Sequence, residues 1–468
     1  MIERSDILIA SEAVTDEADV RRVLANRVAD VLVRPMRSAV RVVRLVVPVG
    51  PVDPFAWLAA QPLLPRVYWE GRDDGLEVAA VGAADLLEGA AGDDYDTLRA
   101  QLDRVLAYSD EQVRYFGGFR FDRTFPPDEA WAPFGTYRFV LPRFELDRRA
   151  GEAVLVCNLL LPRDREREQE ILGQIERLTL PQADLSGELP LPVARHDHPD
   201  AEGWRRNIAW ALDAFGRTTL EKVVLARKAV FAFVDPLDPV LLLKGLRAAT
   251  PGCFHFGFQP EPGVAFVGAS PERLFRRDER GVWSEAVAGT RPRGDSDRTD
   301  AALREELLHS EKDLREHEYV RVSIRDGLSQ LCDVLDVDAA ATEMRLARGR
   351  HLLSRVQGTL REGVHGSEVM RALHPTPAVG GFPTAAALEA IRTLEPFDRG
   401  WYAGPLGWIG KHGAEFAVAI RSGLVRPGRL DLFSGAGIVD GSVAAWEWDE
   451  IEQKIGDFVK VLGLDVQA

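Results

Sequence analysis

Lysine is so rare in this chain that each one is a candidate for chemistry. Of the 58 basic residues only seven are lysines, and the first 221 residues contain none. Arginine can replace lysine in most roles, but it cannot give up its proton at working pH and so cannot act as a general base. The first places to look for acid–base catalysis are therefore Lys222, Lys228, Lys244, Lys312, Lys411, Lys454 and Lys460.

Lys454 belongs to a polar stripe on a helix predicted near the end of the chain. Apolar residues repeat at helical spacing over Ala445–Leu462, and Glu447, Glu450 and Lys454 lie on the adjacent stripe. From the spacing alone, this stripe is a solvated helix face that carries an i,i+4 Glu–Lys pair. Glu316, on a second predicted helix, has the same simple interpretation.

An arginine and a run of small residues follow each other in the last quarter of the sequence. In a strand over Glu415–Leu424, Arg421 shares one face with two alanines, so it either has room for a ligand beside it or reaches solvent. We interpret Ser434–Val439, Ser-Gly-Ala-Gly-Ile-Val, as a turn that could expose backbone N–H groups to an anion. It is not a dinucleotide-binding fingerprint, because no helix opens after its glycines.

Two further segments, His374–Gly381 and Arg399–Trp408, contain too much proline and glycine for a regular element, and we expect shaped loops. The chain has neither the residue order of a Ser/His/Asp triad nor an HExxH zinc motif. His309 and His317 have no third ligand at a metal spacing, so we expect core or surface histidines there.

The composition excludes several classes of protein. Lys+Arg 58 against Asp+Glu 73 gives a net charge of −15, which is no footprint for nucleic acid or an anionic membrane. Cys157, Cys253 and Cys332 lie far apart without a CxxC pair, which argues against a disulfide scaffold and a zinc ribbon. The first residues lack the pattern of a signal peptide, and no apolar run approaches the roughly 20 residues of a spanning helix. We expect a cytoplasmic globular protein.

Strand-like and helix-like segments alternate irregularly, which predicts an α+β fold rather than regular βαβ units. A proline-rich stretch, Pro181–Gly203, separates an N-terminal half (1–195) from a C-terminal half (196–468). The expected strands are Val40–Val49, Tyr137–Pro142, Ala153–Leu161, Lys222–Phe233, Cys253–Gln259, Val264–Gly268, Glu415–Leu424 and Leu430–Phe433. The expected helices are Asp96–Tyr108, Asp164–Leu178, Trp204–Phe215, one long helix over Thr299–Leu331 capped by Asp297 or Thr299, and Ala445–Leu462.

Nine short motifs occur in an order that resembles the chorismate-utilising enzymes. Two of the nine are the loops described above. The other seven are Lys222-Val-Val-Leu-Ala-Arg, Gly268-Ala-Ser-Pro-Glu-Arg-Leu, Ala288-Gly-Thr-Arg-Pro-Arg-Gly, Glu311-Lys-Asp-Leu-Arg-Glu-His, Ala419-Ile-Arg-Ser-Gly, Gly435-Ala-Gly-Ile-Val and Glu447-Trp-x-Glu-x-x-x-Lys454. In addition, Tyr115-Phe-Gly-Gly-Phe-Arg-Phe-Asp and Phe139-Val-Leu-Pro-Arg resemble the N-terminal half of the isochorismate synthase branch of that family.

The resemblance implies a large α+β fold with mixed β-sheets flanked by helices around a central cleft, which holds chorismate and one Mg²⁺. By position in the motifs, Glu316 and Glu450 correspond to the metal ligands, and carboxylate oxygens are ligands that Mg²⁺ prefers. Arg421 and Lys454 correspond to partners of the pyruvyl carboxylate, so an acidic protein would contain a locally positive cleft. The remaining substrate-binding positions are Gly289, Thr290, His374, Ala378, Tyr402, Ile420 and Gly435.

The reaction that the resemblance implies is attack of water at ring carbon C2 with loss of the C4 hydroxyl, which gives isochorismate. Lys222 corresponds to the general base for the water, and Glu272 corresponds to the general acid for the leaving group. The two side chains must be tuned in opposite directions, because the lysine has to lose a proton and the glutamate has to keep one. Desolvation in a closed cleft favours both neutral forms.

Three alternatives share much of the resemblance. Salicylate synthases share Lys222 and Glu272 and go on to eliminate pyruvate. Anthranilate and aminodeoxychorismate synthases use ammonia, and these relatives usually carry threonine where this chain has Ala378. The third alternative is a chorismate-binding protein without activity. We expect a monomer that needs no glutamine amidotransferase, and the resemblance leaves open whether isochorismate would feed menaquinone, siderophore or salicylate biosynthesis.

Overall fold

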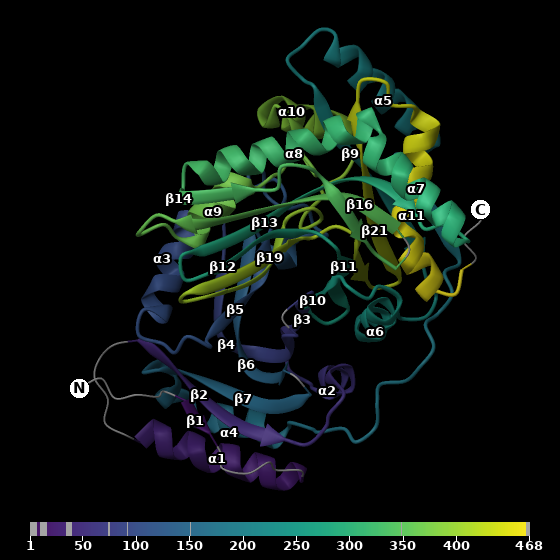
Figure 1. The fold of residues 1–468 in the computed structure, drawn as a ribbon. Coiled ribbons are helices and arrows are strands. Elements are labelled where there is room, and N and C mark those ends of the chain that lie inside the picture. Colours follow the sequence, from purple (N-terminus) through teal and green to yellow (C-terminus); the bar gives the residue numbers. More distant parts are fainter. Residues whose placement is uncertain are drawn as a thin grey trace.

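In the part of the chain that the structure describes, 21 strands form one mixed sheet with helices on its faces (Figure 1). The computed structural model describes residues 7–9, 16–33, 40–73, 75–90, 92–149, 151–347 and 349–464. Neighbouring strands run antiparallel except for the short β1–β2 pair, and the helices pack on the outer faces. This is the α+β architecture that the sequence predicts. Within the described residues, no helix is both long and apolar enough to cross a bilayer.

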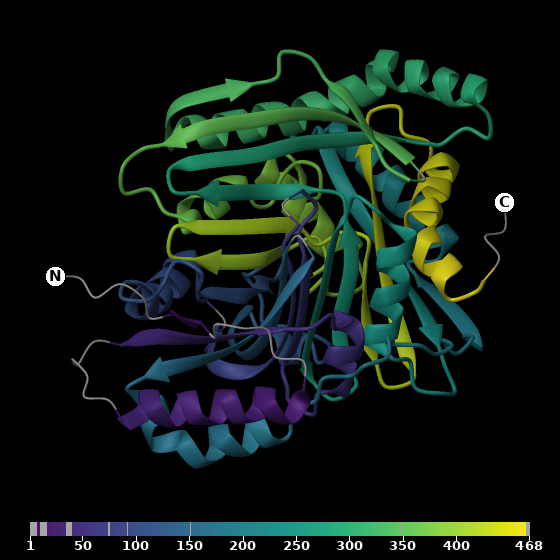
Figure 2. The same ribbon diagram turned by 60° about the horizontal axis from the view of Figure 1, so that its bottom comes forward.

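The N-terminal half places two helices, α1 and α4, side by side against its strands (Figure 2). The strands predicted near residues 40–49 and 153–161 are confirmed, whereas the one predicted at Tyr137–Pro142 continues to Arg149. The elements of this half are β1 (Ile7–Ile9), α1 (Glu17–Val33), β2 (Arg41–Val49), α2 (Pro54–Ala60), β3 (Arg66–Glu70), β4 (Glu77–Glu88), α3 (Tyr95–Leu106), β5 (Arg114–Phe119), β6 (Tyr137–Arg149), β7 (Glu152–Leu161), α4 (Glu168–Glu176) and β8 (Ala194–His198).

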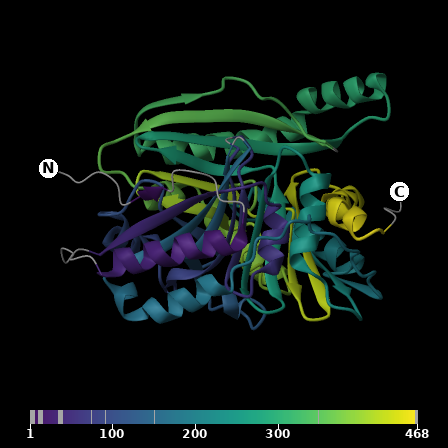
Figure 3. The same cartoon turned by 90° about the horizontal axis from the view of Figure 1, so that it is seen from below.

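The C-terminal half surrounds the central strand pair β9–β21 with helices. Figure 3 shows α7 at one end of the β13–β16 layer, on the same side of the molecule as α11. Its elements are α5 (Ala201–Phe215), β9 (Lys222–Ala232), α6 (Pro239–Ala249), β10 (Phe254–Glu261), β11 (Val264–Ser270), β12 (Arg273–Asp278), β13 (Gly281–Pro292), α7 (Asp297–His309), α8 (Glu311–Ser329), β14 (Cys332–Val337), β15 (Thr342–Arg345), β16 (Gly349–Leu360), α9 (Gly366–Leu373), β17 (Gly381–Phe382), α10 (Thr384–Leu394), β18 (Pro405–Gly410), β19 (Gly413–Val418), β20 (Ser422–Arg426), β21 (Arg429–Val439) and α11 (Ala444–Val461).

Strand pairing joins the two halves. In the N-terminal half, β3 pairs with β10 at Trp69↔Phe256, and β5 pairs with β18 at Phe116↔Trp408. The proline-rich stretch between the halves contains β8, an exposed edge strand that the sequence analysis missed. The division at residue 195 stays a prediction, because backbone hydrogen bonds continue the sheet across it.

The single long helix predicted over Thr299–Leu331 is wrong. The chain leaves helical geometry at Ser310 (φ −71°, ψ 111°), which ends α7 and also begins α8 by accepting a hydrogen bond from the backbone N–H of Asp313. The predicted cap is wrong as well, since Ser296 caps α7 and Thr299 completes the capping box from within the helix. The pattern of polar and apolar residues continues through Ser310, so helical periodicity does not reveal that α7 ends and α8 begins there.

A buried ion pair in the N-terminal half allows a test of the packing. Arg143 donates to both carboxylate oxygens of Asp164, and the two side chains are 1% and 0% exposed. Asp164→Ala leaves a buried guanidinium without its counter-charge, and we expect a loss of about 3–5 kcal/mol of stability. Urea unfolding measures the change in the free energy of unfolding. Asp103→Ala is the control, because its partly exposed ion pair with Arg99 should contribute less than about 1 kcal/mol to stability. Equal losses in the two variants would contradict it.

Candidate active site

One pocket brings together most of the residues that the sequence analysis selected. Its lining residues come from α8, α11, the ends of β13 and β21, and the loops after α9 and before β18. Eleven of the thirteen selected residues line it. They are Glu272, Gly289, Thr290, Glu316, Ala378, Tyr402, Ile420, Arg421, Gly435, Glu450 and Lys454.

Lys222 lies directly beside this pocket, at the first position of β9. Its side chain is fully buried, and its Nζ is 3.0 Å from Oε1 of the pocket residue Glu316 on α8. The two atoms are within ion-pair distance, but the contact does not have hydrogen-bond geometry. Strand β9 can bury this lysine because β21 covers it on one side, at Val439, and β17 on the other, at Phe382.

Two residues of the polar stripe of α11, Glu450 and Lys454, line the pocket. Glu450 forms an ion pair with Lys454 at 2.6 Å, and Lys454 also donates to the backbone carbonyl of Gly435 at 2.8 Å. Burial alone would raise the pKa of Glu450, but the adjacent Lys454 ammonium lowers it overall. Glu447 is almost fully buried and pairs with Lys312 on α8 at 2.8 Å. The solvated-face interpretation is therefore wrong for Glu447, while Glu450 lines the pocket with 33% of its side chain exposed.

The small-residue run Ser434–Val439 is not a turn but the last part of strand β21. It pairs with β9 throughout, with Gly435 opposite Ala226 and Gly437 opposite Val224. The N–H groups of Ala226 and Val224 bond on the other side of β9, to Glu395 and to Gly380. In an antiparallel pair, the residues opposite them also point their N–H groups outward. Gly435 and Gly437 therefore present backbone N–H groups on the edge of β21 away from β9.

Arg421 lies in the short connection between two strands, and its side chain reaches the pocket from there. The predicted strand Glu415–Leu424 is two strands, β19 and β20, and Arg421 between them has a left-handed conformation with φ 50°. Its carbonyl accepts from the N–H of Ala269 at 3.0 Å, which holds this conformation. A left-handed arginine is uncommon, so tertiary contacts and not strand periodicity aim its side chain.

Gly289 and Thr290 form an irregularity in β13 where its register with β16 shifts. Gly289 has φ 66°, a conformation that favours glycine. His351, on β16, lies with Nδ1 3.0 Å from the carbonyl oxygen of Gly289 and 3.2 Å from Oγ1 of Thr290. Burial lowers the pKa of His351 to about 4, and Arg421 contributes, so the ring is neutral. The sequence analysis missed this pocket residue, because no spacing connects it with the others.

Glu272 contributes a carboxyl group that keeps its proton at neutral pH. Burial raises its pKa to about 8, with a further contribution from Glu285, while Lys222 and Lys454 act in the opposite direction. Its backbone N–H donates to Oγ of Ser270 at 3.2 Å. The pocket thus contains a neutral carboxylic acid that interacts electrostatically with two lysines.

His374 is the selected residue that the structure places away from the pocket. It is buried at the end of α9, its Nε2 is 3.2 Å from the carbonyl oxygen of Phe121, and its ring packs edge-on against Phe121. Burial lowers its pKa to about 3. His374 is the first residue of the loop after α9, and later residues of this loop, Ala378 and Val379, line the pocket. A direct contact with a ligand in this pocket is therefore not supported for His374.

The donor set suits a hard divalent cation. Glu316 and Glu450, from two different helices, line the same pocket. Within the part of the chain that the structure describes, no group of three or more His, Cys, Asp or Glu side chains is arranged around a common point. Two carboxylates with remaining positions for water and a bound ligand are a set that Mg²⁺ accepts, since it keeps several waters.

Comparison with known protein families matches residues 31–463 to the family described as chorismate binding enzyme. The chloroplastic isochorismate synthase 2 of Arabidopsis thaliana is 34% identical over 479 residues, covering 94% of this chain and 84% of that protein. The solved structure of MenF, the menaquinone-specific isochorismate synthase from Escherichia coli, matches with a TM-score of 0.82 at 28% identity, covering 96% of this chain and 100% of that one. Anthranilate synthase component I from Streptococcus pneumoniae TIGR4, at 20% identity and a TM-score of 0.68 over 84% of this chain and 93% of that one, shares the fold.

Gly437 offers a test of how tightly the pocket is built. A Cβ at this position would lie 2.3 Å from Oε1 of Glu316 and 3.1 Å from Cε of Lys222. We expect Gly437→Ala to displace the Glu316 carboxylate, and titration calorimetry with Mg²⁺, the cation that the resemblance implies, should then show about tenfold weaker binding than for the unchanged protein. Gly173→Ala on α4 is the matched control, because a Cβ there meets nothing within 4 Å. Unchanged Mg²⁺ affinity in Gly437→Ala would remove Glu316 from the ligand set.

Proposed function

This chain belongs to the chorismate-binding enzyme family, and from that premise we propose that it is an isochorismate synthase, which converts chorismate to isochorismate with the help of Mg²⁺. One observation carries the proposal. A fully buried lysine, Lys222, lies beside the same pocket that a protonated glutamate, Glu272, lines. A base and an acid of this kind are what addition of one hydroxyl group and departure of another require.

Chorismate carries two carboxylates, and the pocket contains cations for them. Arg421 and Lys454 line it together, and we assign the pyruvyl carboxylate to these two side chains. The outward N–H groups of Gly435 and Gly437 assist by donating to the same anion. Tyr402, whose pKa burial raises to about 12, stays a neutral hydroxyl and closes the pocket by stacking on Phe433 with ring centroids 5.2 Å apart.

Glu316 and Glu450 are the residues that would hold Mg²⁺. The ion would supply positive charge for the ring carboxylate of chorismate, which two glutamates alone would repel. Lys454, 2.6 Å from Glu450, lowers the pKa of that carboxyl group and favours its ionised form, and Oε1 of Glu316 lies 3.0 Å from Nζ of Lys222.

In the proposed reaction, Nζ of Lys222 takes a proton from water as the water oxygen bonds to C2 of the ring. The ring double bonds shift, the bond between C4 and its hydroxyl oxygen breaks, and Glu272 gives its proton to the departing oxygen, which leaves as water. Nζ of Lys222 lies 3.0 Å from the pocket residue Glu316, so we assign to it a water held in the adjacent pocket. Solvent exchange returns the proton from Lys222 to Glu272 between turnovers.

The alternative reactions within the family differ from this one in the nucleophile or in a later step. A salicylate synthase would use the same pair and then eliminate pyruvate, and an ammonia-using enzyme would need a different nucleophile in the pocket. Ala378 lines the pocket here, where ammonia-using relatives usually carry threonine. We therefore assign water as the nucleophile and propose that the enzyme works without a glutamine-hydrolysing partner.

The decisive experiment is incubation of the purified protein with chorismate and Mg²⁺, followed by liquid chromatography of the products. We expect isochorismate to approach a stable mixture with chorismate, and EDTA to abolish its formation. Lys222→Ala should reduce turnover by roughly 100-fold or more, as loss of a general base does. Salicylate with pyruvate, or an aminated product that depends on ammonium, would move the enzyme to another branch, and near-normal turnover in Lys222→Ala would refute the base.

Glu272 also predicts a pH dependence. Its carboxyl group is protonated below its pKa of about 8 and ionised above it, and a general acid works only in the protonated form. Turnover should therefore fall as the pH rises through about 8, and Glu272→Gln should be nearly inactive at every pH. Initial rates at saturating chorismate from pH 6 to 10 check this, and a profile that stays flat to the alkaline end would contradict the assignment.

A further inference from the structure

Arg72 connects the N-terminal half of the chain to the segment that carries Glu272. It lies in the turn between β3 and β4 and is mostly buried. Its Nη1 donates to the carbonyl oxygen of Pro271 at 2.7 Å and to Oε2 of Glu285 at 3.0 Å, and its Nη2 donates to the other oxygen of Glu285. One guanidinium therefore holds both the residue before Glu272 and the nearest carboxylate on β13.

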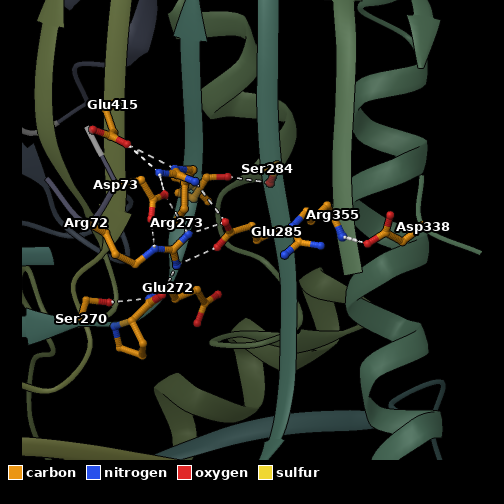
Figure 4. Close-up of polar contacts among 12 residues, drawn as sticks. Arg72, Asp73, Ser270, Glu272, Arg273, Ser284, Glu285, Asp338, Arg355 and Glu415 are labelled. Atoms are coloured by element: carbon orange, nitrogen blue, oxygen red, sulfur yellow. Dashed lines mark hydrogen bonds and ion pairs between the residues drawn. The ribbon is translucent and has the colours of Figure 1, made fainter. Parts of the chain in front are cut away.

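A second arginine completes the cluster from the other side of Glu272. Arg273 donates to Glu285 at 3.0 Å, to Glu415 at 3.0 Å, and to Asp73 of the same β3–β4 turn at 2.6 Å. Figure 4 shows this cluster beside Glu272, whose carboxyl group points away from it and receives none of the drawn bonds. The backbone of Glu272 is thus fixed from both neighbours while its side chain stays available to the pocket.

We propose that Arg72 is a positioning residue for the general acid: it fixes Glu272 through the Pro271 carbonyl and holds the Glu285 carboxylate beside it. Arg72 does not line the pocket, so its effect on catalysis passes through these two contacts. The inference rests on the acid role of Glu272 in the proposed function. Through Arg72, the N-terminal half would contribute to catalysis in addition to contributing strands to the sheet.

The charges around Glu272 determine the sign of the expected pH effects. Glu285 on β13 favours the neutral carboxyl group, while Lys222 on β9 and Lys454 on α11 favour the ionised one. Tyr402 faces it as a neutral hydroxyl. The other charged neighbours lie in the cluster itself: Arg72, Asp73, Arg273 and Glu415. Removing Arg72 takes a cation from this set and leaves Glu285 less neutralised, whereas removing the charge of Glu285 does the opposite.

The test compares the pH profiles of kcat in three variants of the full-length enzyme. Arg72→Met should lower kcat by roughly tenfold and move its alkaline limb up by about 0.5–1 pH unit, with KM for chorismate changed less than about threefold. Glu285→Gln should move the limb down by a similar amount. Arg72→Lys keeps the charge but not the two-pronged contact, so its limb should stay in place while kcat falls.

Arg148→Met is the matched control, because Arg148 also lies in the N-terminal half and pairs with a buried glutamate, Glu77, at 2.9 Å. We expect its kcat profile to match the unchanged enzyme. If Arg72→Met behaves like this control, or if Arg72→Met and Glu285→Gln shift the limb in the same direction, the positioning role is refuted. Should Arg72→Met not fold, Arg72→Lys and Glu285→Gln still decide the question. An active Glu272→Gln would instead refute the proposed acid, so the two failures are distinguishable.

Discussion

Burial of opposite charges in pairs is the constraint on which the site depends. Lys222 and Glu316 join β9 to α8, and Glu450 and Lys454 join the middle of α11 to the edge of β21 through the Gly435 carbonyl. A buried polar group without a partner costs free energy, so these contacts favour keeping β9 next to α8 and α11 next to β21. The pairs leave the pocket close to neutral, and Arg421, which lines the same pocket, then provides the attraction for an anion.

Close approach of backbone and charge requires residues without side chains at particular points. Gly437 lets β21 run against Glu316 and Lys222, and Gly381, with φ 136°, lets the loop after α9 pass within contact of the Lys222 carbonyl. A Cβ at Gly381 would lie 2.3 Å from that oxygen. Gly381 and Gly437 therefore allow close packing around the lysine, and its side chain is shielded from bulk solvent. This shielding is what makes a buried base and a buried acid sensitive to single charges nearby.

The two halves of the chain are one mechanical unit at the site. Strands β3 and β10 continue the sheet across the division, and the β3–β4 turn reaches the segment of Glu272 with one arginine and one aspartate. A neutral glutamate in a cleft needs a fixed and dry environment, since a mobile segment would admit water and lower its pKa. The contact of Arg72 with Pro271, which lies 199 residues further along the chain, adds to the local contacts that hold this segment in place.

The sequence by itself determined the class of fold and the positions of a minority of the strands and about half of the helices, and the motif order that resembles the family indicated most of the residues that form the pocket. It could not show the break at Ser310, the left-handed Arg421, or the strand at Gly435. Nor could it show that His351 enters the pocket, that His374 does not, and that Glu447 is buried against α8. Periodicity separates polar from apolar faces, but it does not record what packs against the polar face. Only the tertiary structure supplies those partners, and with them the burial that gives Lys222 and Glu272 their chemistry.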